Sequence, residues 1–165
     1  MKFILIDKIE AIEPGKRIVT TKQLTLAEEY LADHFPVFPV MPGVLMLEGM
    51  TQSAAWLVRL AQEYDNSVIV LKSARNVKYN YFLKPGNTIR YEVEAMSIDG
   101  GTAKFKGCGY VGERLAVSAR LELACKSLAG LGNYGKGLDE QVNAQNRRTF
   151  ELAGGPAALA AAGSC

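Results

Sequence analysis

The sequence predicts an α+β fold in which an antiparallel sheet wraps around one long central helix. Two β-rich runs, 3–12 and 16–23, surround a Pro14-Gly15 turn and predict a hairpin or bend. A helical stretch over 43–64 is almost uncharged in its first sixteen residues, and a helix that is apolar nearly all round is buried. Further β-like runs follow it, so the order of elements predicts a sheet that grips this helix.

Turn and capping signals define the other elements. A short helix is expected over 25–32, with Thr25 as its N-cap. Pro36, Pro39 and Pro42 keep the next segment extended, and Pro42 suits the first turn of the long helix. The β-like runs after that helix are 67–72, 75–82, 88–97 and 102–124, the last broken at Gly112.

The composition of the chain divides it into two parts. Residues 1–128 are expected to form one folded domain. The glycine-rich stretch 129–137 predicts a flexible linker, and the polar stretch 138–152 can form one surface helix. The low-complexity tail GGPAALAAAGSC is expected to be disordered.

Charge and cysteine usage exclude several classes of protein. A net charge of +2 on 165 residues is too small for a nucleic-acid-binding protein, which carries a strongly basic surface. Three cysteines without a CxxC pair indicate reduced thiols in a cytoplasmic protein and no disulfide framework. The longest nearly uncharged stretch contains three prolines, so no membrane span is expected, and no targeting segment is visible.

Two residues are candidates for acid/base chemistry. His34 is the only histidine, which argues against a histidine-rich metal site, and no metal is expected. Glu48 is the only charged residue from 43 to 58, so the sequence predicts a desolvated carboxyl, which suits a general acid or base. Structural alternatives stay open for both: a histidine that only packs, and a glutamate that bonds the backbone or points outward.

Two neighbours of Glu48 strengthen the catalytic interpretation. Gln52 follows by one helical turn and can orient the carboxylate. Gly43, at the helix N-terminus, offers a backbone N–H that can polarise a carbonyl oxygen. An imidazole, a bare N–H and a carboxylate together suit removal of a proton beside a carbonyl and protonation of a leaving oxygen, and an acyl thioester fits this chemistry.

These residues lie in three short motifs that together resemble a known enzyme family. The motifs are His34-Phe35-Pro36, Pro39-Val40-Met41-Pro42-Gly43-Val44-Leu45 and Leu47-Glu48-Gly49-Met50-Thr51-Gln52. They resemble the active-site segment of the bacterial beta-hydroxyacyl-[acyl carrier protein] dehydratases, and the His-to-Glu spacing fits as well. The likeness extends over roughly residues 1–128 through Asp7, Glu13-Pro14-Gly15-Lys16-Arg17-Ile18, Val77-Lys78-Tyr79 and Lys84-Pro85-Gly86.

The resemblance implies a hot-dog fold paired as a homodimer, often as a trimer of dimers, with each acyl tunnel at a subunit interface. It places His34 opposite Glu48 of the partner subunit. His34 would remove the Cα proton, and Glu48, directly or through water, would protonate the departing 3-hydroxyl. The Gly43 N–H would hold the thioester oxygen, the Val40 carbonyl would orient His34, and Gln52 would support Glu48.

The activity implied is that of a hydro-lyase in fatty acid or related lipid biosynthesis. A 3-hydroxyacyl-[acyl carrier protein] would lose water and leave the trans-2-enoyl thioester. No cofactor is implied beyond the phosphopantetheine of the acyl carrier protein. Glu48, in place of an aspartate, resembles the branch that dehydrates without isomerising the double bond.

Departures from the family pattern keep alternatives open. Val37 stands where the family usually has glycine, and the residues that also differ are Phe38, Arg75, Asn80, Phe82 and Asn87. A non-catalytic or specialised hot-dog paralogue that binds acyl thioesters is therefore an alternative. An acyl-CoA hydratase or thioesterase is disfavoured, because R-specific hydratases place an aspartate before their histidine and here the carboxylate follows.

Two further sets of residues carry weaker predictions. A basic set can meet the acidic acyl carrier protein, with a solvated strand face as the alternative; it comprises Lys72, Arg75, Lys78 and, less centrally, Lys84 and Lys106. Four large side chains are expected in the core rather than in the substrate tunnel, with membership of both at a dimer interface as the alternative for some of them: Met46, Met50, Trp56 and Phe82.

Overall fold

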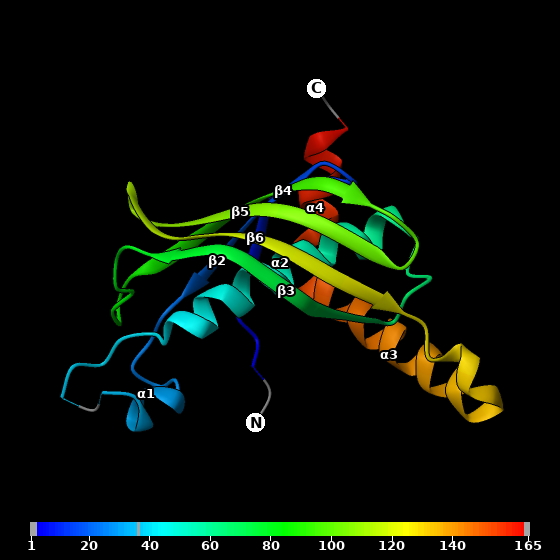
Figure 1. Cartoon of the computed structure of the whole chain (residues 1–165), viewed down its shortest axis with the longest axis horizontal. Helices are drawn as coiled ribbons and strands as arrows, with labels where there is room; N and C mark the ends of the chain where they lie inside the picture. Colours follow the sequence, from blue (N-terminus) through cyan, green and yellow to red (C-terminus); the bar gives the residue numbers. More distant parts are fainter. Residues whose placement is uncertain (1–2, 36, 164–165) are drawn as a thin grey trace.

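The computed structural model describes residues 3–35 and 37–163. The strands are β1 Lys8–Glu13, β2 Arg17–Gln23, β3 Val68–Tyr79, β4 Thr88–Ile98, β5 Thr102–Val111 and β6 Arg114–Lys126. They form one antiparallel sheet in the order β1-β2-β4-β5-β6-β3, which arches over α2 (Gly43–Ala61; Figure 1). Since α2 packs against β2 to β6, the predicted sheet around one long helix is confirmed.

One side of α2 is anchored in the core beneath the sheet. Met46, Met50 and Leu57 are at most 2% exposed, and their separations of four and seven residues place them on one helix face. A buried hydrogen bond of 2.7 Å between Thr20 Oγ1 and Ser53 Oγ ties α2 to β2. This packing sets the position of the residues at the start of α2.

Strand β3 replaces the two separate runs predicted over 67–72 and 75–82. Its pairing with β6 shifts register on both sides of Ser73–Arg75, and Asn76 has a left-handed φ of 54°. Bulges of this kind interrupt the alternation of side chains while the strand continues. The prediction of two strands is therefore wrong. The sequence shows that the alternation of side chains is interrupted, but it does not show that β6 pairs with the residues on both sides of the interruption.

Both helices near the candidate site are shorter than predicted. The first, α1, spans only Tyr30–Asp33, because Thr25 Oγ1 accepts a hydrogen bond of 3.3 Å from Ala27 N and holds a turn there. The second, α2, ends at Ala61, because Glu63 and the tyrosine after it have left-handed φ angles of 49° and 67°. Local backbone conformation thus limits each helix.

The described part of the C-terminal segment, up to residue 163, is helical, contrary to the predicted linker and disordered tail, while residues 164 and 165 of that tail lie outside the described residues. A 3-10 turn, η1 (Ala129–Leu131), leads into α3 (Gly132–Leu152) and then α4 (Gly155–Ala162). The predicted surface helix therefore begins earlier, inside the expected linker. Figure 1 shows α3 running beside α2 on the same side of the sheet.

Contacts with distant residues explain why this glycine-rich segment folds. The ring of Phe150 lies 5.4 Å from that of Trp56, and Ile9 N donates a hydrogen bond of 2.8 Å to Ala153 O. Asp139 accepts hydrogen bonds from Ser67 and Leu128. Tertiary contacts of this kind outweigh the low helix propensity of glycine, which composition alone reports.

Candidate active site

A tight turn positions His34. The half-buried His34 follows α1, and its ring centroid lies 4.4 Å from that of Phe35. Phe35 has a left-handed φ of 50°, which is unfavourable for a residue other than glycine, and its carbonyl accepts a hydrogen bond of 2.8 Å from Phe38 N. Val37, at this turn, is 98% exposed, so its side chain packs against nothing in the protomer. Pro36 of the motif lies outside the described residues.

His34, Val40 and Gly43 line one cavity of about 380 Å³. Gly43 begins α2, where the first N–H groups have no acceptor within the helix. A Cβ on Gly43 would lie 3.0 Å from Cε1 of Tyr79, so the ring of Tyr79 leaves little room for a side chain. The fold therefore places the imidazole and the helix N-terminus at the same cavity wall.

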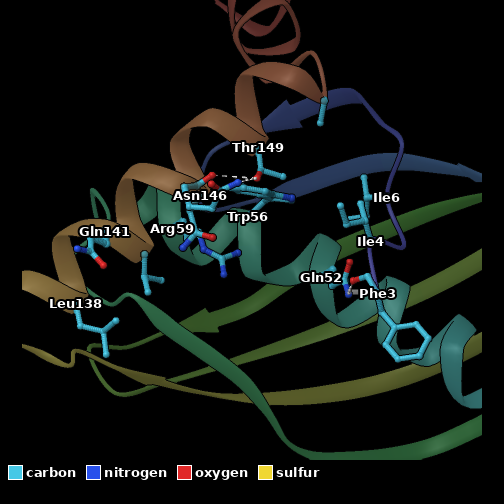
Figure 2. Close-up of a pocket in the computed structure, with 13 residues that line it drawn as sticks. Phe3, Ile4, Ile6, Gln52, Trp56, Arg59, Leu138, Gln141, Asn146 and Thr149 are labelled. Atoms are coloured by element: carbon cyan, nitrogen blue, oxygen red, sulfur yellow. Dashed lines mark hydrogen bonds between the residues drawn. The ribbon is translucent and has the colours of Figure 1, made fainter. Parts of the chain in front are cut away.

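Glu48 and Gln52 form a hydrogen-bonded pair further along α2. Gln52 Nε2 donates to Glu48 Oε1 at 3.0 Å and to Phe3 O at 3.2 Å. Gln52 Oε1 accepts from Leu5 N at 3.0 Å. Gln52, beside Phe3 in Figure 2, thus joins the carboxylate to the N-terminal segment, as the spacing of the two residues predicts for a supporting role.

Glu48 is half-buried in the protomer, and the desolvation of its carboxyl stays a prediction. The α2 face that carries it is turned away from the sheet: Val44, one turn earlier, is 67% exposed, whereas Met46 is 2% exposed. The uncharged sequence of α2 predicts burial on all sides. The protomer covers α2 almost completely from Gly49 to Val58, where only Gln52 is not buried, and leaves the face of Val44 and Glu48 partly uncovered.

The protomer does not bring all five predicted residues together. The cavity of His34 is lined by the α2 residues Gly43, Val44 and Met46, but not by Glu48 or Gln52. The five residues therefore fall into two groups: His34, Val40 and Gly43 at this cavity, and the hydrogen-bonded pair of Glu48 and Gln52 further along α2.

Aromatic residues that the sequence analysis did not select complete the His34 cavity. Tyr79 and Tyr81 line it, and burial raises the pKa of Tyr79. Phe82 lines it as well, is 57% exposed, and meets Phe38 edge-on with centroids 5.8 Å apart. The prediction that Phe82 is core is wrong, whereas Met46, Met50 and Trp56 are buried as predicted. The cluster of aromatic residues from Tyr79 to Phe82, at the end of β3 and just after it, was the sequence signal that could have indicated this cavity wall.

The basic residues predicted to meet a carrier protein are exposed on the edge strand β3. Lys72 forms an ion pair of 2.7 Å with Glu122 across to β6. Arg75 and Lys78 are exposed, with register positions opposite Arg120 and Ser118. Lys72 is thus partly neutralised, while the other two are presented to solvent.

Two classes of feature are not found in residues 3–35 and 37–163. No group of three or more histidine, cysteine or acidic side chains there is placed to hold a metal ion. No helix in this part of the chain has the length and apolar character of a membrane span.

Residues 1–120 match the family model of the FabA-like domain. The 3-hydroxyacyl-[acyl-carrier-protein] dehydratase FabZ of Clostridium kluyveri is 36% identical over 119 residues, which cover 72% of this chain and 83% of that protein. The enzyme of the same name from Variovorax paradoxus is 38% identical over 129 residues, covering 76% and 86%.

Solved structures resemble the fold at low sequence identity. The dehydratase heterocomplex ApeI:P from Xenorhabdus doucetiae matches with a TM-score of 0.59 and 17% identity, over 74% of this chain and 82% of that one. A hypothetical thioesterase with coenzyme A from Streptococcus pneumoniae TIGR4 matches with a TM-score of 0.55 and 13% identity, over 72% and 86%. At such identities these likenesses show the fold alone.

Proposed function

The chain belongs to the FabA-like family, and from this premise we infer that it is a hydro-lyase with the hot-dog fold, a 3-hydroxyacyl-[acyl carrier protein] dehydratase. It removes water from a 3-hydroxyacyl thioester and leaves the trans-2-enoyl product, in fatty acid or related lipid biosynthesis. One observation carries this function: His34 and the free N–H of Gly43 share a cavity, and Glu48 stands on the same helix with a supporting amide.

In the proposed mechanism, His34 takes the Cα proton while the Gly43 N–H holds the thioester oxygen, where negative charge develops. The Cα–Cβ double bond forms as the 3-hydroxyl departs with a proton from Glu48, giving water. The Val40 carbonyl orients the His34 ring. Gln52 holds the Glu48 carboxyl in place. The hydrogen bond of 3.0 Å that Gln52 Nε2 donates to Glu48 Oε1 supports this role.

The proposed site lies between two subunits of a homodimer, His34 facing Glu48 of the partner subunit. The apolar rim of the His34 cavity supports this arrangement, because large exposed apolar patches mark interfaces. The exposed apolar residues that line the cavity are Phe35, Val44 and Phe82, and Phe38 packs against Phe82 beside them. Assembly of the dimers into a trimer of dimers is part of the same proposal.

The substrate is proposed to arrive on the phosphopantetheine of an acyl carrier protein in the cytoplasm. Lys72, Arg75 and Lys78 would steer the acidic carrier, as their exposure on β3 permits. The reaction needs no metal or organic cofactor, because both proton transfers are assigned to side chains of the protein itself.

The test is dehydration of a 3-hydroxyacyl-[acyl carrier protein], followed by mass spectrometry. The parent is expected to convert it, and Glu48→Gln to lose roughly 10²- to 10⁴-fold in rate, the usual contribution of a general acid. Glu140→Gln, an exposed position on α3, is the matched control and should keep the parent's rate. No conversion at any chain length would sink the function, and full activity of Glu48→Gln would remove Glu48 from the mechanism.

A further inference from the structure

A second cavity, of about 370 Å³, lies between α2, α3 and the N-terminal segment. Figure 2 shows Trp56 and Arg59 of α2 close to Asn146 of α3. Gln52 lies nearer the start of α2, beside Phe3 of the N-terminal segment. The three α2 residues that line it are three and four positions apart, and therefore share one helix face. The mechanism proposed above uses only one of them, Gln52.

Two hydrogen-bond donors in this cavity have no acceptor. Arg59 Nε and Asn146 Nδ2 are shielded from solvent and without a hydrogen-bond partner in the described part of the chain. A buried donor that stays unpaired is costly, and a buried charge more so. A ligand that brings acceptor atoms would remove this cost if it displaces the protein atoms that now cover these two donors.

The guanidinium of Arg59 also has no counter-ion among the described residues. It lies over the Trp56 ring, with the Arg59 Cζ 4.8 Å from the ring centroid, and it also interacts electrostatically with Tyr64 and Cys125. Burial lowers the pKa of Arg59 to about 10, which still leaves the side chain charged at neutral pH. The cavity therefore presents a permanent positive charge together with a neutral donor, a combination that a carboxylate matches with two acceptor oxygens.

The cavity begins beside the proposed catalytic carboxyl. Gln52 lines the cavity and donates a hydrogen bond to Glu48 Oε1. Arg59 lies eleven residues after Glu48, roughly 16 Å along the helix axis at the rise of an α-helix. Between these two ends the lining includes the apolar side chains of Phe3, Ile4 and Trp56. The cavity thus suits an alkyl chain that starts near Glu48 and ends in a polar group at Arg59.

The outer wall of this cavity lies outside the part of the chain that matches the family model. It is formed by α3, which lies beyond residues 1–120 that match the family model. Selectivity that arises here is therefore separate from the chemistry that the family shares. Asn146 is the α3 residue that faces Arg59 with a free donor.

We propose that the cavity between α2 and α3 binds the far end of the acyl chain and selects substrates that end in a carboxylate, held by Arg59 and Asn146. This inference rests on the proposed function for the identity of the substrate. The binding site itself can be tested without turnover.

Trp56 is the only tryptophan of the chain and lines the cavity, so its fluorescence reports occupancy. Decanoate is expected to change the emission of the full-length protein saturably, and decanamide, which lacks the charge, to bind more weakly. Arg59→Met and, independently, Asn146→Leu are expected to weaken decanoate binding roughly tenfold to a hundredfold. Arg148→Met, an exposed arginine of α3 outside the cavity, is the matched control.

Failure of this titration has a clear meaning. Equal binding of decanoate and decanamide, or unchanged affinity in both variants, would overturn the carboxylate site. Circular dichroism of each variant shows whether it is folded, and Asn146→Leu tests the site even where Arg59→Met does not fold.

Turnover tests the substrate class. Two 3-hydroxyacyl-[acyl carrier protein] substrates of equal length are compared, one ending in a methyl group and one in a carboxylate. The parent is expected to have the higher kcat/KM for the carboxylate, and Arg59→Met to bring the ratio of the two values close to one. Equal kcat/KM values in the parent would overturn this inference alone. Conversion of neither would overturn the proposed function, and the Trp56 titration would then decide the carboxylate site.

Discussion

Gly49 of α2 faces Tyr91 of β4 at a distance that excludes any side chain. A Cβ at position 49 would lie 2.5 Å from Tyr91 Oη and 2.7 Å from its Cζ. Tyr91 is fully buried, and its hydroxyl has no hydrogen-bond partner in the described part of the chain. Because neighbouring side chains enclose the ring, it has little room to move aside.

Gly49→Ala is therefore expected to destabilise the protein by about 1–3 kcal/mol through overpacking, although alanine is the better helix former. Gly137→Ala on α3 is the matched control: nothing lies within 4 Å of the added Cβ, and a gain of about 0.5–1 kcal/mol is expected. Urea unfolding of both variants beside the parent measures the two effects. A gain in stability at both positions would contradict the close approach of α2 and β4.

Asp139 is the residue that fixes α3 to the rest of the molecule. Its carboxylate accepts hydrogen bonds from Ser67 Oγ at 2.5 Å, Leu128 N at 2.7 Å and Ser127 Oγ at 3.1 Å. These donors come from the start of β3 and from the segment after β6, so a single side chain joins three elements. The docking of α3 in turn closes the cavity around Trp56.

Asp139→Ala is expected to cost about 1–2 kcal/mol, the range for hydrogen bonds to a charged group at a partly exposed site. Trp56 fluorescence during urea unfolding is the measurement, because α3 covers this side chain. Glu140→Ala, on the neighbouring exposed position, should stay within about 0.5 kcal/mol of the parent. Equal effects of the two substitutions would show that Asp139 does not anchor α3.

Acid should loosen α3 through the same carboxylate. The hydrogen bond from Ser67, more than any other contact, lowers the pKa of Asp139. Its stabilising contribution is thus complete above the unfolded pKa of about 3.9 and is lost as the pH falls through the lower folded value. The Trp56 signal of the parent is expected to change below about pH 4, and Asp139→Ala should lack this part of the change. An identical acid profile for both proteins would contradict the assignment.

At the scale of the whole molecule, the two halves of the proposed site lie on separate surfaces of one protomer. Glu48 does not line the cavity of His34, and in the proposed homodimer the two complete each other across the interface. In a dimer with two-fold symmetry each subunit would supply the histidine of one site and the glutamate of the other. Variants that are each inactive can then complement one another.

Mixing His34→Ala with Glu48→Gln is expected to restore activity. Random exchange of subunits would give roughly a quarter of the parent's activity, because half of the dimers are mixed and each mixed dimer has one intact site of two. The dehydration assay after co-refolding of the variants is the measurement, and mixing either variant with itself is the control. Absence of recovery in proven mixed dimers would place both residues in a site within one subunit.

Much of the fold and of the site follows from interactions within a few residues along the chain. The turn at Pro14-Gly15, the helix start after Pro42 and the alternation in β4 and β5 were all recognisable, because turn sterics and side-chain periodicity act locally. The pairing of Glu48 with Gln52 was recognisable for the same reason: four residues make one helical turn.

Only the tertiary structure decided which faces are covered and what distant segments contribute. Phe82 lines the cavity of His34, Glu48 is half-buried in the protomer, and the glycine-rich segment after Leu128 folds as α3. The sequence by itself determined the element order, the sheet around one helix and the residues of the acid/base motif. Burial and the second cavity depend on contacts such as Trp56 with Phe150, which join residues far apart in the chain and leave no local periodic signal.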